Sequence, residues 1–195
     1  MQKVYFNVQW LNKFHPAYVA NGREWRLRNS INRHETVVDP SLEKSRAAED
    51  FARAFLEESI ALSDKTIISY SKRNVRGQLI RFYNEVDAVQ LVDKDTVAIF
   101  EVKHSNRNSA FKKAHKQLTH NAEILSTLYK NVFRFLVIVE PEMIEEDVDV
   151  KSCSRKDFET QESDFVLIDL PTERVGKDKV ALIWLNRDVQ LEHDN

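Results

Sequence analysis

The sequence contains little glycine and proline. Its 195 residues include 3 glycines and 4 prolines, whereas average usage would give roughly 23 of the two together. Few turns are therefore encoded, and we expect long helices and strands joined by short loops. The glycines, Gly22, Gly77 and Gly176, lie too far apart to form a glycine-rich phosphate loop of the dinucleotide or Walker type. The composition thus disfavours enzymes that use nucleotide cofactors.

The sequence also lacks cysteine pairs and long apolar runs. Because Cys153 is the single cysteine, an internal disulfide, a thiolate zinc site and a CxxC redox pair are all excluded. The longest purely apolar run, Phe135 to Val139, is far shorter than the roughly 20 residues that cross a membrane. The first residues do not form the apolar centre of a signal peptide. We therefore predict a cytoplasmic or nuclear protein that does not contact membranes.

The remaining composition is typical of a folded globular chain. Hydrophobic residues make up 42% and charged residues 31%, with a net charge of −2. The length corresponds to about one domain. We divide the chain into an amino-terminal extension over residues 1–38, a core over 39–139, an acidic connector over 140–164, and carboxy-terminal strands over 165–195 that complete the same domain.

The charges are segregated along the chain. Residues 66–84 carry four basic side chains and residues 102–122 carry five, with no acid in either stretch. Such local fields attract nucleic acid even when the whole protein is nearly neutral, although an ordinary solvated surface is the alternative for each stretch. The acidic connector, with ten acids against three basic residues, could dock a basic protein partner. The candidate phosphate-binding residues are Lys72, Arg73, Arg76, Arg107, Lys112, Lys113 and Lys116.

A helix is predicted to begin at Pro40, because Asp39 before it has the form of a helix cap. Its apolar residues recur at helical spacing and form one stripe, namely Ala48, Phe51, Ala52, Phe55, Leu56 and Leu62. Glu49 falls within this stripe, whereas Asp50 and Glu57 point away from it. An inward carboxylate must be paired, bound to a metal, or able to reach solvent at the edge of the stripe.

Apolar runs predict the strands of a mixed α/β fold. After a first strand within residues 3–11, we expect strands at Ile67–Tyr70, Leu79–Val92 and Thr96–Val102. The last two would form a hairpin that is covered on both faces, since both are apolar on both sides. A second amphipathic helix is predicted over 109–130, followed by a parallel strand over 132–139 and further strands over 165–170 and 180–185.

Charged residues interrupt the two apolar strands of the predicted hairpin. Asp87 lies on the first strand, and Glu101 and Lys103 share a face near the end of the second. The hairpin would bring them together, with Glu49 approaching from the first helix. Crowded carboxylates in a dry site need a cation, and oxygen ligands of this kind suit Mg²⁺ or Mn²⁺. The cluster therefore predicts metal-dependent hydrolysis of phosphodiester bonds.

The run Asn84-Glu85-Val86-Asp87, followed fourteen residues after Asp87 by Glu101-Val102-Lys103, resembles the PD-(D/E)xK nuclease motif. The pattern is most similar to the Holliday-junction-resolvase-like and Mrr-like branches. The resemblance implies a restriction-endonuclease-like αβββαβ core, with a mixed central sheet flanked by helices and with terminal additions. Val86 stands where the motif has proline, and Asn121 stands where one subfamily has tyrosine.

The resemblance also implies roles for individual residues. Glu49, Asp87, Glu101 and the backbone carbonyl of Val102 would hold Mg²⁺ or Mn²⁺. Lys103 would be the catalytic lysine, and Gln117 matches a polar residue that many members place on the helix after the motif.

The sequence thus predicts a metal-dependent endonuclease or exonuclease that hydrolyses phosphodiester bonds by attack of a metal-activated water, with DNA expected as the substrate more than RNA. The alternative is a catalytically inactive nuclease-fold module for nucleic-acid binding or assembly. A homodimer is compatible with either reading.

Overall fold

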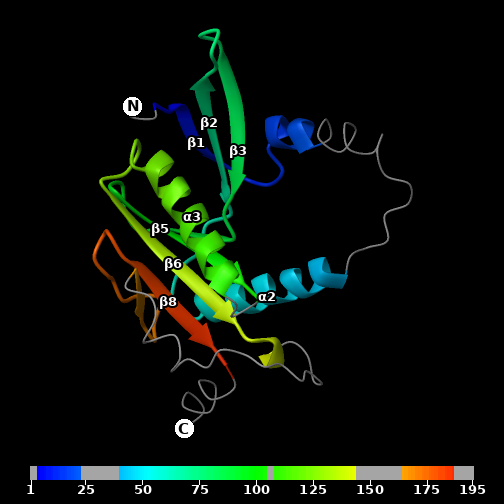
Figure 1. Cartoon of the computed structure of the whole chain (residues 1–195), viewed down its shortest axis with the longest axis vertical. Helices are drawn as coiled ribbons and strands as arrows, with labels where there is room; N and C mark the ends of the chain where they lie inside the picture. Colours follow the sequence, from blue (N-terminus) through cyan, green and yellow to red (C-terminus); the bar gives the residue numbers. More distant parts are fainter. Residues whose placement is uncertain (1–3, 23–39, 105–107, 144–163, 187–195) are drawn as a thin grey trace.

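The computed structural model describes residues 4–22, 40–104, 108–143 and 164–186. The fold is mixed α/β and contains a three-stranded and a five-stranded sheet. Figure 1 shows the elements, whose bounds are β1 Phe6–Leu11, α2 Pro40–Glu57, β2 Ile67–Arg73, β3 Leu79–Glu85, β4 Ala88–Leu91, β5 Thr96–Lys103, α3 Asn108–Leu125, β6 Asn131–Val139, β7 Phe165–Leu167 and β8 Val180–Leu185. A short helix over residues 16–22 follows β1, and a single 3₁₀ turn, Pro141–Met143, follows β6.

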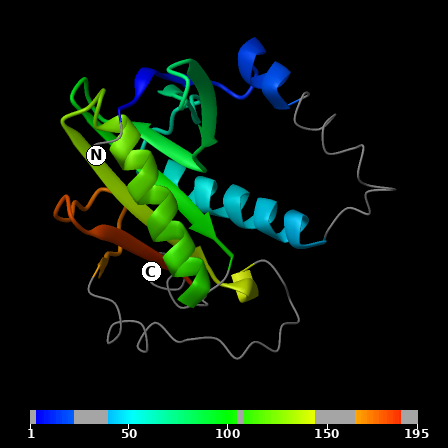
Figure 2. The same cartoon turned by 45° about the horizontal axis from the view of Figure 1, so that its top comes forward.

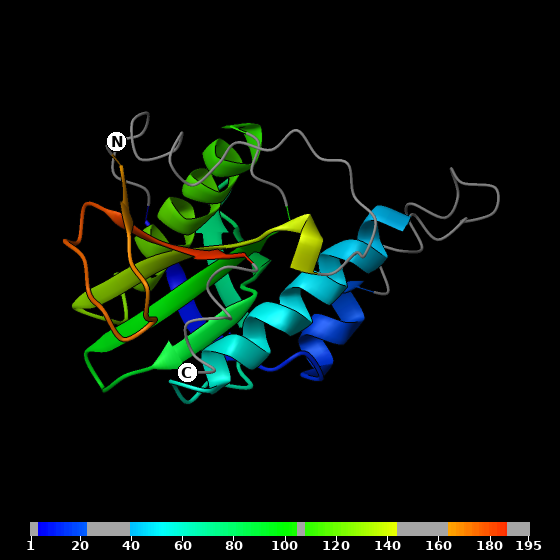
Figure 3. The ribbon, with the colours of Figure 1, turned by 90° about the horizontal axis from the view of Figure 1, so that it is seen from below.

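The five-stranded sheet has the order β4-β5-β6-β8-β7 and holds the core. β4 and β5 form the predicted antiparallel hairpin, and β6 joins β5 in parallel, as expected for a strand that follows a helix. The two carboxy-terminal strands extend the same sheet in parallel. Figure 3 shows α2 and α3 on opposite sides of this sheet.

Each helix covers one face of the sheet because β5 alternates between the two faces. Val97 and Ile99 pack with the buried residues of α3. Ala98 and Phe100 pack with those of α2. Glu101 and Lys103 continue the first alternation, so strand parity places both side chains on the α3 face of the sheet.

The prediction of one strand over Leu79–Val92 is wrong. The chain changes sheets at Val86 and Asp87, so that β3 pairs with β2, and β4 pairs with β5. The backbone N–H of Val86 donates to the carbonyl of Thr66 (2.9 Å) and fixes the bend. Apolar residues lie before and after the run Asn84-Glu85-Val86-Asp87, so their pattern predicts one strand, whereas the bend lies within this mostly polar run. The predicted cover on both faces holds for β5, whereas Ile80 and other residues of β3 are exposed.

The small sheet, in the order β1-β2-β3, carries a hairpin that projects beyond the core (Figures 1 and 2). At its tip, the side chain of Asn74 accepts hydrogen bonds from the backbone N–H groups of Arg76 (2.9 Å) and Gln78 (3.0 Å). Gly77 has a φ of +77°, which L side chains rarely adopt. The tip exposes Val75 and Arg76 to solvent.

Both helices begin within one residue of the predicted position. Helix α2 has its first residue at Pro40 and buries Ala48, Ala52 and Leu56. Helix α3 ends at Leu125, five residues before the predicted end, and Leu128 is exposed. The hydroxyl of Thr127 donates to the carbonyl of Ile124 (2.8 Å), a local bond that competes with helix continuation.

In the described part of the chain, no helix is long and apolar enough to cross a membrane. The predicted helix cap Asp39, the phosphate-binding candidate Arg107 and most of the acidic connector lie outside the described residues.

Candidate active site

Asp87 stands at the point where the chain passes from one sheet to the other. The register pairs its neighbour Ala88 with Phe100, so Asp87 comes to lie beside the end of β5. Its Oδ2 accepts the backbone N–H of Val102 at 2.7 Å. This hydrogen bond holds Asp87 beside the segment Glu101-Val102-Lys103. The pairing of β4 with β5 brings the two groups within reach of each other.

Glu101 and Lys103 form an ion pair at the end of β5. The Lys103 ammonium contacts Oε1 of Glu101, and Glu101 is 3% exposed. A buried carboxylate requires such a partner. Asp87, Glu101 and Lys103, which the sequence places on two segments, thus meet at one end of the five-stranded sheet.

Glu49 approaches the cluster from α2 and is partly buried, as its position in the apolar stripe predicts. Burial raises its pKa, and the negative charge of Asp87 adds to that effect. Burial likewise raises the pKa of Asp87, against the Val102 hydrogen bond and the charge of Lys103. Burial together with the charge of Asp87 raises the pKa of Glu101 to about 7, although Lys103 opposes this. The carboxylates therefore repel one another and favour a bound cation or proton.

The donor chemistry fits a hard divalent cation, but the side chains are not arranged around one. Within residues 4–22, 40–104, 108–143 and 164–186, no three His, Cys, Asp or Glu side chains form a group that could hold a metal ion. In this arrangement Lys103 donates to one oxygen of Glu101, and the Val102 amide donates to one oxygen of Asp87. Carboxylate oxygens of this kind are the ligands that Mg²⁺ and Mn²⁺ prefer.

Three residues that the sequence analysis did not single out also contact this region. Lys13 pairs with Glu85 (3.3 Å), and the hydroxyl of Tyr18 donates to the same carboxylate (3.3 Å). Arg53 of α2 donates to the backbone carbonyl of Asp87 (3.1 Å). The amino-terminal segment has no regular period, so no local signal identifies Lys13 or Tyr18. Arg53 lies four residues after Glu49, and helical spacing could have found it.

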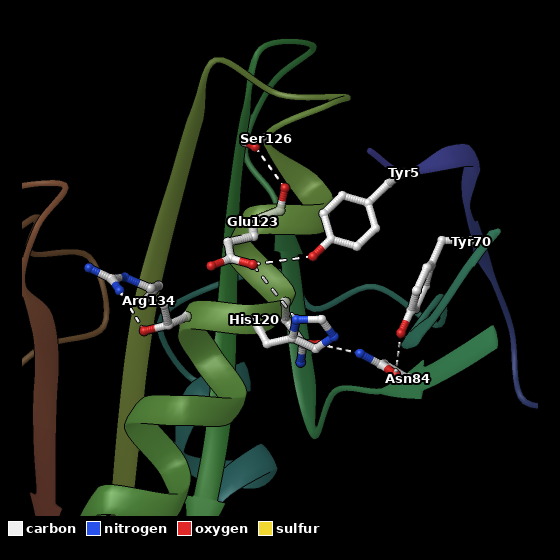
Figure 4. A network of polar contacts seen from close by, with 9 residues as sticks. Tyr5, Tyr70, Asn84, His120, Glu123, Ser126 and Arg134 are labelled. Atoms are coloured by element: carbon white, nitrogen blue, oxygen red, sulfur yellow. Dashed lines mark hydrogen bonds and ion pairs between the residues drawn. The ribbon is translucent and has the colours of Figure 1, made fainter. Parts of the chain in front are cut away.

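Gln117 and Asn121 line a pocket of about 450 Å³ between β3 and α3, with Tyr83, Asn84, Glu85 and His120. The amide of Asn84 donates to Oδ1 of Asn121 (2.8 Å) and accepts the hydroxyl of Tyr70 (3.4 Å), as Figure 4 shows for Asn84 and Tyr70. Oε1 of Gln117 is buried and has no hydrogen-bond partner within the described residues. Of these two polar residues of α3, Asn121 therefore has a partner in the described part of the chain.

The basic candidates occupy two places. Arg73 and Arg76 lie exposed on the projecting hairpin, and the three lysines of α3, Lys112, Lys113 and Lys116, are also exposed. Lys72 differs, because its ammonium lies 5.1 Å from the ring centres of Tyr5 and Tyr70 and 5.5 Å from that of Phe82. Aromatic rings attract a cation in this position. Lys72 is therefore held by the small sheet and is less accessible to a phosphate than Arg76.

The raised pKa values of the carboxyl groups predict how stability depends on pH. Between about pH 4 and pH 7 the folded protein binds protons that the unfolded chain has released, so the free energy of unfolding falls as pH rises through this window. Asp87→Asn removes one of the repelling charges and should reduce this fall. Urea unfolding in a chelator at about pH 5 and about pH 8 measures it.

The exposed Asp50, on the outer face of α2, offers the matched control. Asp50→Asn should leave the pH dependence of the wild type unchanged. An equally steep fall in Asp87→Asn would contradict the electrostatic coupling described above.

No protein-family model matches this chain, and neither a curated protein nor a solved structure with significant similarity was found.

Proposed function

We propose that this protein is a metal-dependent nuclease that hydrolyses phosphodiester bonds, with DNA as its substrate. The observation that carries the proposal is the meeting of Asp87, Glu101 and Lys103 at the end of β5. The two carboxylates and the amine lie close together, and the negative charge of Glu49 also acts on Glu101. In metal-dependent hydrolysis, carboxylates hold the metal ion and a positively charged group stabilises the phosphate. We also propose that the protein belongs to the PD-(D/E)xK nucleases, which its motif resembles.

The order of the elements supports a restriction-endonuclease-like core. Helix α2 comes before the hairpin strands β4 and β5, and helix α3 then leads to the parallel strand β6. Both helices flank the sheet (Figure 3). The bend at Val86 and Asp87 means that the second of the three expected strands is divided between two sheets.

In this proposal, Glu49, Asp87, Glu101 and the carbonyl of Val102 would hold Mg²⁺ or Mn²⁺. Such an ion, when bound, neutralises the carboxylates and polarises a phosphodiester. Lys103 would leave Glu101 and place its ammonium against the attacked phosphate, where it stabilises the charge that develops in the transition state. Arg53 donates a hydrogen bond to the backbone carbonyl of Asp87 and would thereby keep the bend, and the side chain of Asp87, in position.

The direct test uses purified full-length protein with supercoiled plasmid, single-stranded DNA and RNA. Each substrate is incubated with Mn²⁺, with Mg²⁺ and with EDTA. We expect nicking or degradation of DNA in the presence of metal and intact DNA in EDTA. If every substrate stays intact in every metal, the proposal is wrong.

A second candidate is a nuclease-fold module that binds nucleic acid without cutting it. The observation that favours it is that the described residues form no ready group of three metal ligands. Isothermal titration with Mn²⁺ separates the two functions. A nuclease should bind the ion at the carboxylates, and Asp87→Asn should remove that binding, whereas the inactive module has no need of the ion.

The exposed cations of the projecting hairpin predict a salt-dependent affinity. Arg76 and Arg81 are exposed, and residues 66–84 contain no acid. If each contacts one phosphate, Arg76→Ala and Arg81→Ala should each reduce the slope of log affinity against log salt by about 1. Fluorescence anisotropy with a labelled duplex in Ca²⁺ measures the slopes. Lys94→Ala, in the turn between β4 and β5, is the control and should keep the wild-type slope.

A further inference from the structure

The pocket between β3 and α3 adjoins the proposed catalytic carboxylates. Glu85, two residues before Asp87, forms part of its wall, together with Tyr83 and Asn84 from the same strand. Gln117, His120 and Asn121 of α3 form the opposite wall. Glu101 and Lys103 project to the same α3 side of the sheet by strand parity. The pocket and the side chain of Lys103 thus lie on the same side of the five-stranded sheet.

The lining selects a neutral ligand with hydrogen-bonding edges. Among the described residues no lysine or arginine lines the pocket, and Glu85 contributes a carboxylate. Lys13 already pairs with this carboxylate (3.3 Å), so the described lining gives a phosphate no lysine or arginine to bind, whereas its amides can hydrogen-bond a neutral ligand. Amides and rings form the rest of the lining, and its volume of about 450 Å³ lies in the range of small-molecule sites.

One polar atom in this wall lacks a partner. Oε1 of Gln117 is buried, and no described residue donates a hydrogen bond to it. Buried polar atoms are nearly always satisfied in folded proteins, by protein, water or ligand. This oxygen is shielded from solvent, and a rotation of the Gln117 side chain toward the pocket would let it accept a hydrogen bond from a donor such as an amino group.

The neighbouring amides are already held in place. Asn84 donates to Asn121 (2.8 Å) and accepts from Tyr70 (3.4 Å), so the wall behind the pocket is fixed before any ligand arrives. Farther along α3, Glu123 lies 3.9 Å from His120 and accepts the hydroxyl of Tyr5 (3.2 Å). Figure 4 shows these contacts around His120 and Asn84. A pre-organised wall lowers the entropy lost when a ligand binds.

We propose that this pocket binds one unpaired nucleobase of the substrate, the base next to the phosphate that is cut. The inference rests on the proposed nuclease function and names its substrate class as nucleic acid with a single-stranded or extruded nucleotide at the cleavage point. The base would stack against the rings of Tyr83 or His120, as extruded bases do in other enzymes. Gln117 would accept its exocyclic amino group, which favours adenine, cytosine or guanine over thymine.

The test measures binding without cleavage. Single-stranded oligonucleotides carry either 2-aminopurine, which has an exocyclic amino group and a fluorescence that stacking quenches, or an abasic residue at the same position. Affinities are measured with the wild type in EDTA and with Lys103→Met in Mn²⁺. We expect quenching of 2-aminopurine, and tighter binding of the intact strand than of the abasic strand.

The matched variants are Gln117→Leu and Gln9→Leu, the latter on the exposed side of β1. Gln117→Leu should weaken binding of the intact strand up to about 10-fold, the value of one hydrogen bond, and should leave the abasic strand unaffected. Gln9→Leu should change neither. The inference would be overturned if the wild type bound the intact and the abasic strand equally well. It would also be overturned if neither strand bound in EDTA or in Mn²⁺.

Failure of this inference differs from failure of the proposed function. If plasmid is cut in Mn²⁺ while abasic and intact strands bind equally, the nuclease remains and the base pocket is refuted. If the base binds but no metal supports cleavage, the nuclease is refuted and the pocket remains as a nucleic-acid-binding site.

Discussion

Replacing Lys103 by methionine should lower the rate of DNA cleavage by about 10²–10³-fold, because the variant loses the cation that stabilises charge in the transition state. Methionine keeps much of the length of the lysine side chain, so packing at the end of β5 should change little. Asp87→Asn should have an effect of at least the same size, since it removes a carboxylate from the proposed metal site. Rates are measured as conversion of supercoiled plasmid in Mn²⁺.

Two exposed residues provide controls of matched chemistry. Lys94→Met lies in the turn between β4 and β5, and Asp50→Asn lies on the outer face of α2. Both should cleave at the wild-type rate. Circular dichroism and thermal unfolding should show that all four variants are folded. Cleavage that continues undiminished in Lys103→Met and Asp87→Asn would exclude this cluster as the active site, whatever other residues cut the DNA.

Addition of Mn²⁺ should raise the melting temperature of the wild type by about 5–10 °C at a hundredfold excess over the dissociation constant. Ligand at this excess stabilises the folded state by about 2.7 kcal/mol, and each kcal/mol shifts the midpoint by about 2–4 °C in a chain of this size. The metal would also compensate the charges of Glu49, Asp87 and Glu101, whose pKa values are raised by burial and, to a smaller extent, by neighbouring carboxylates. Differential scanning calorimetry measures the shift.

The same titration with Asp87→Asn isolates the site. The variant should show little shift with Mn²⁺, while its melting temperature without metal at about pH 8 should be equal to or above that of the wild type, because one repelling charge is gone. Asp50→Asn should shift like the wild type. A full Mn²⁺ shift in Asp87→Asn would place the ion elsewhere and contradict the proposed ligands.

Local patterns predicted the elements whose residues obey a single period. Helix α2 begins at Pro40 and turns Glu49 inward, and β5 runs through Thr96–Val102 with both faces buried. The parallel addition of β6 followed from its position after a helix. The end of α3 was predicted too late, since the apolar spacing continues through Leu128 while hydrogen bonds of the last turn, such as that of Thr127, stop the helix.

The amino-acid sequence by itself determined which charged residues interrupt apolar strands, and hence that Asp87, Glu101 and Lys103 would meet. Only the tertiary structure decided that the chain changes sheets at Val86, that Lys13 and Tyr18 reach Glu85, and that Lys72 lies among three rings. The pocket at Gln117 could also be known only from the tertiary structure, because two segments that are far apart in the sequence form its walls. Periodicity reports the environment along one segment, whereas contacts between distant segments depend on how their surfaces pack.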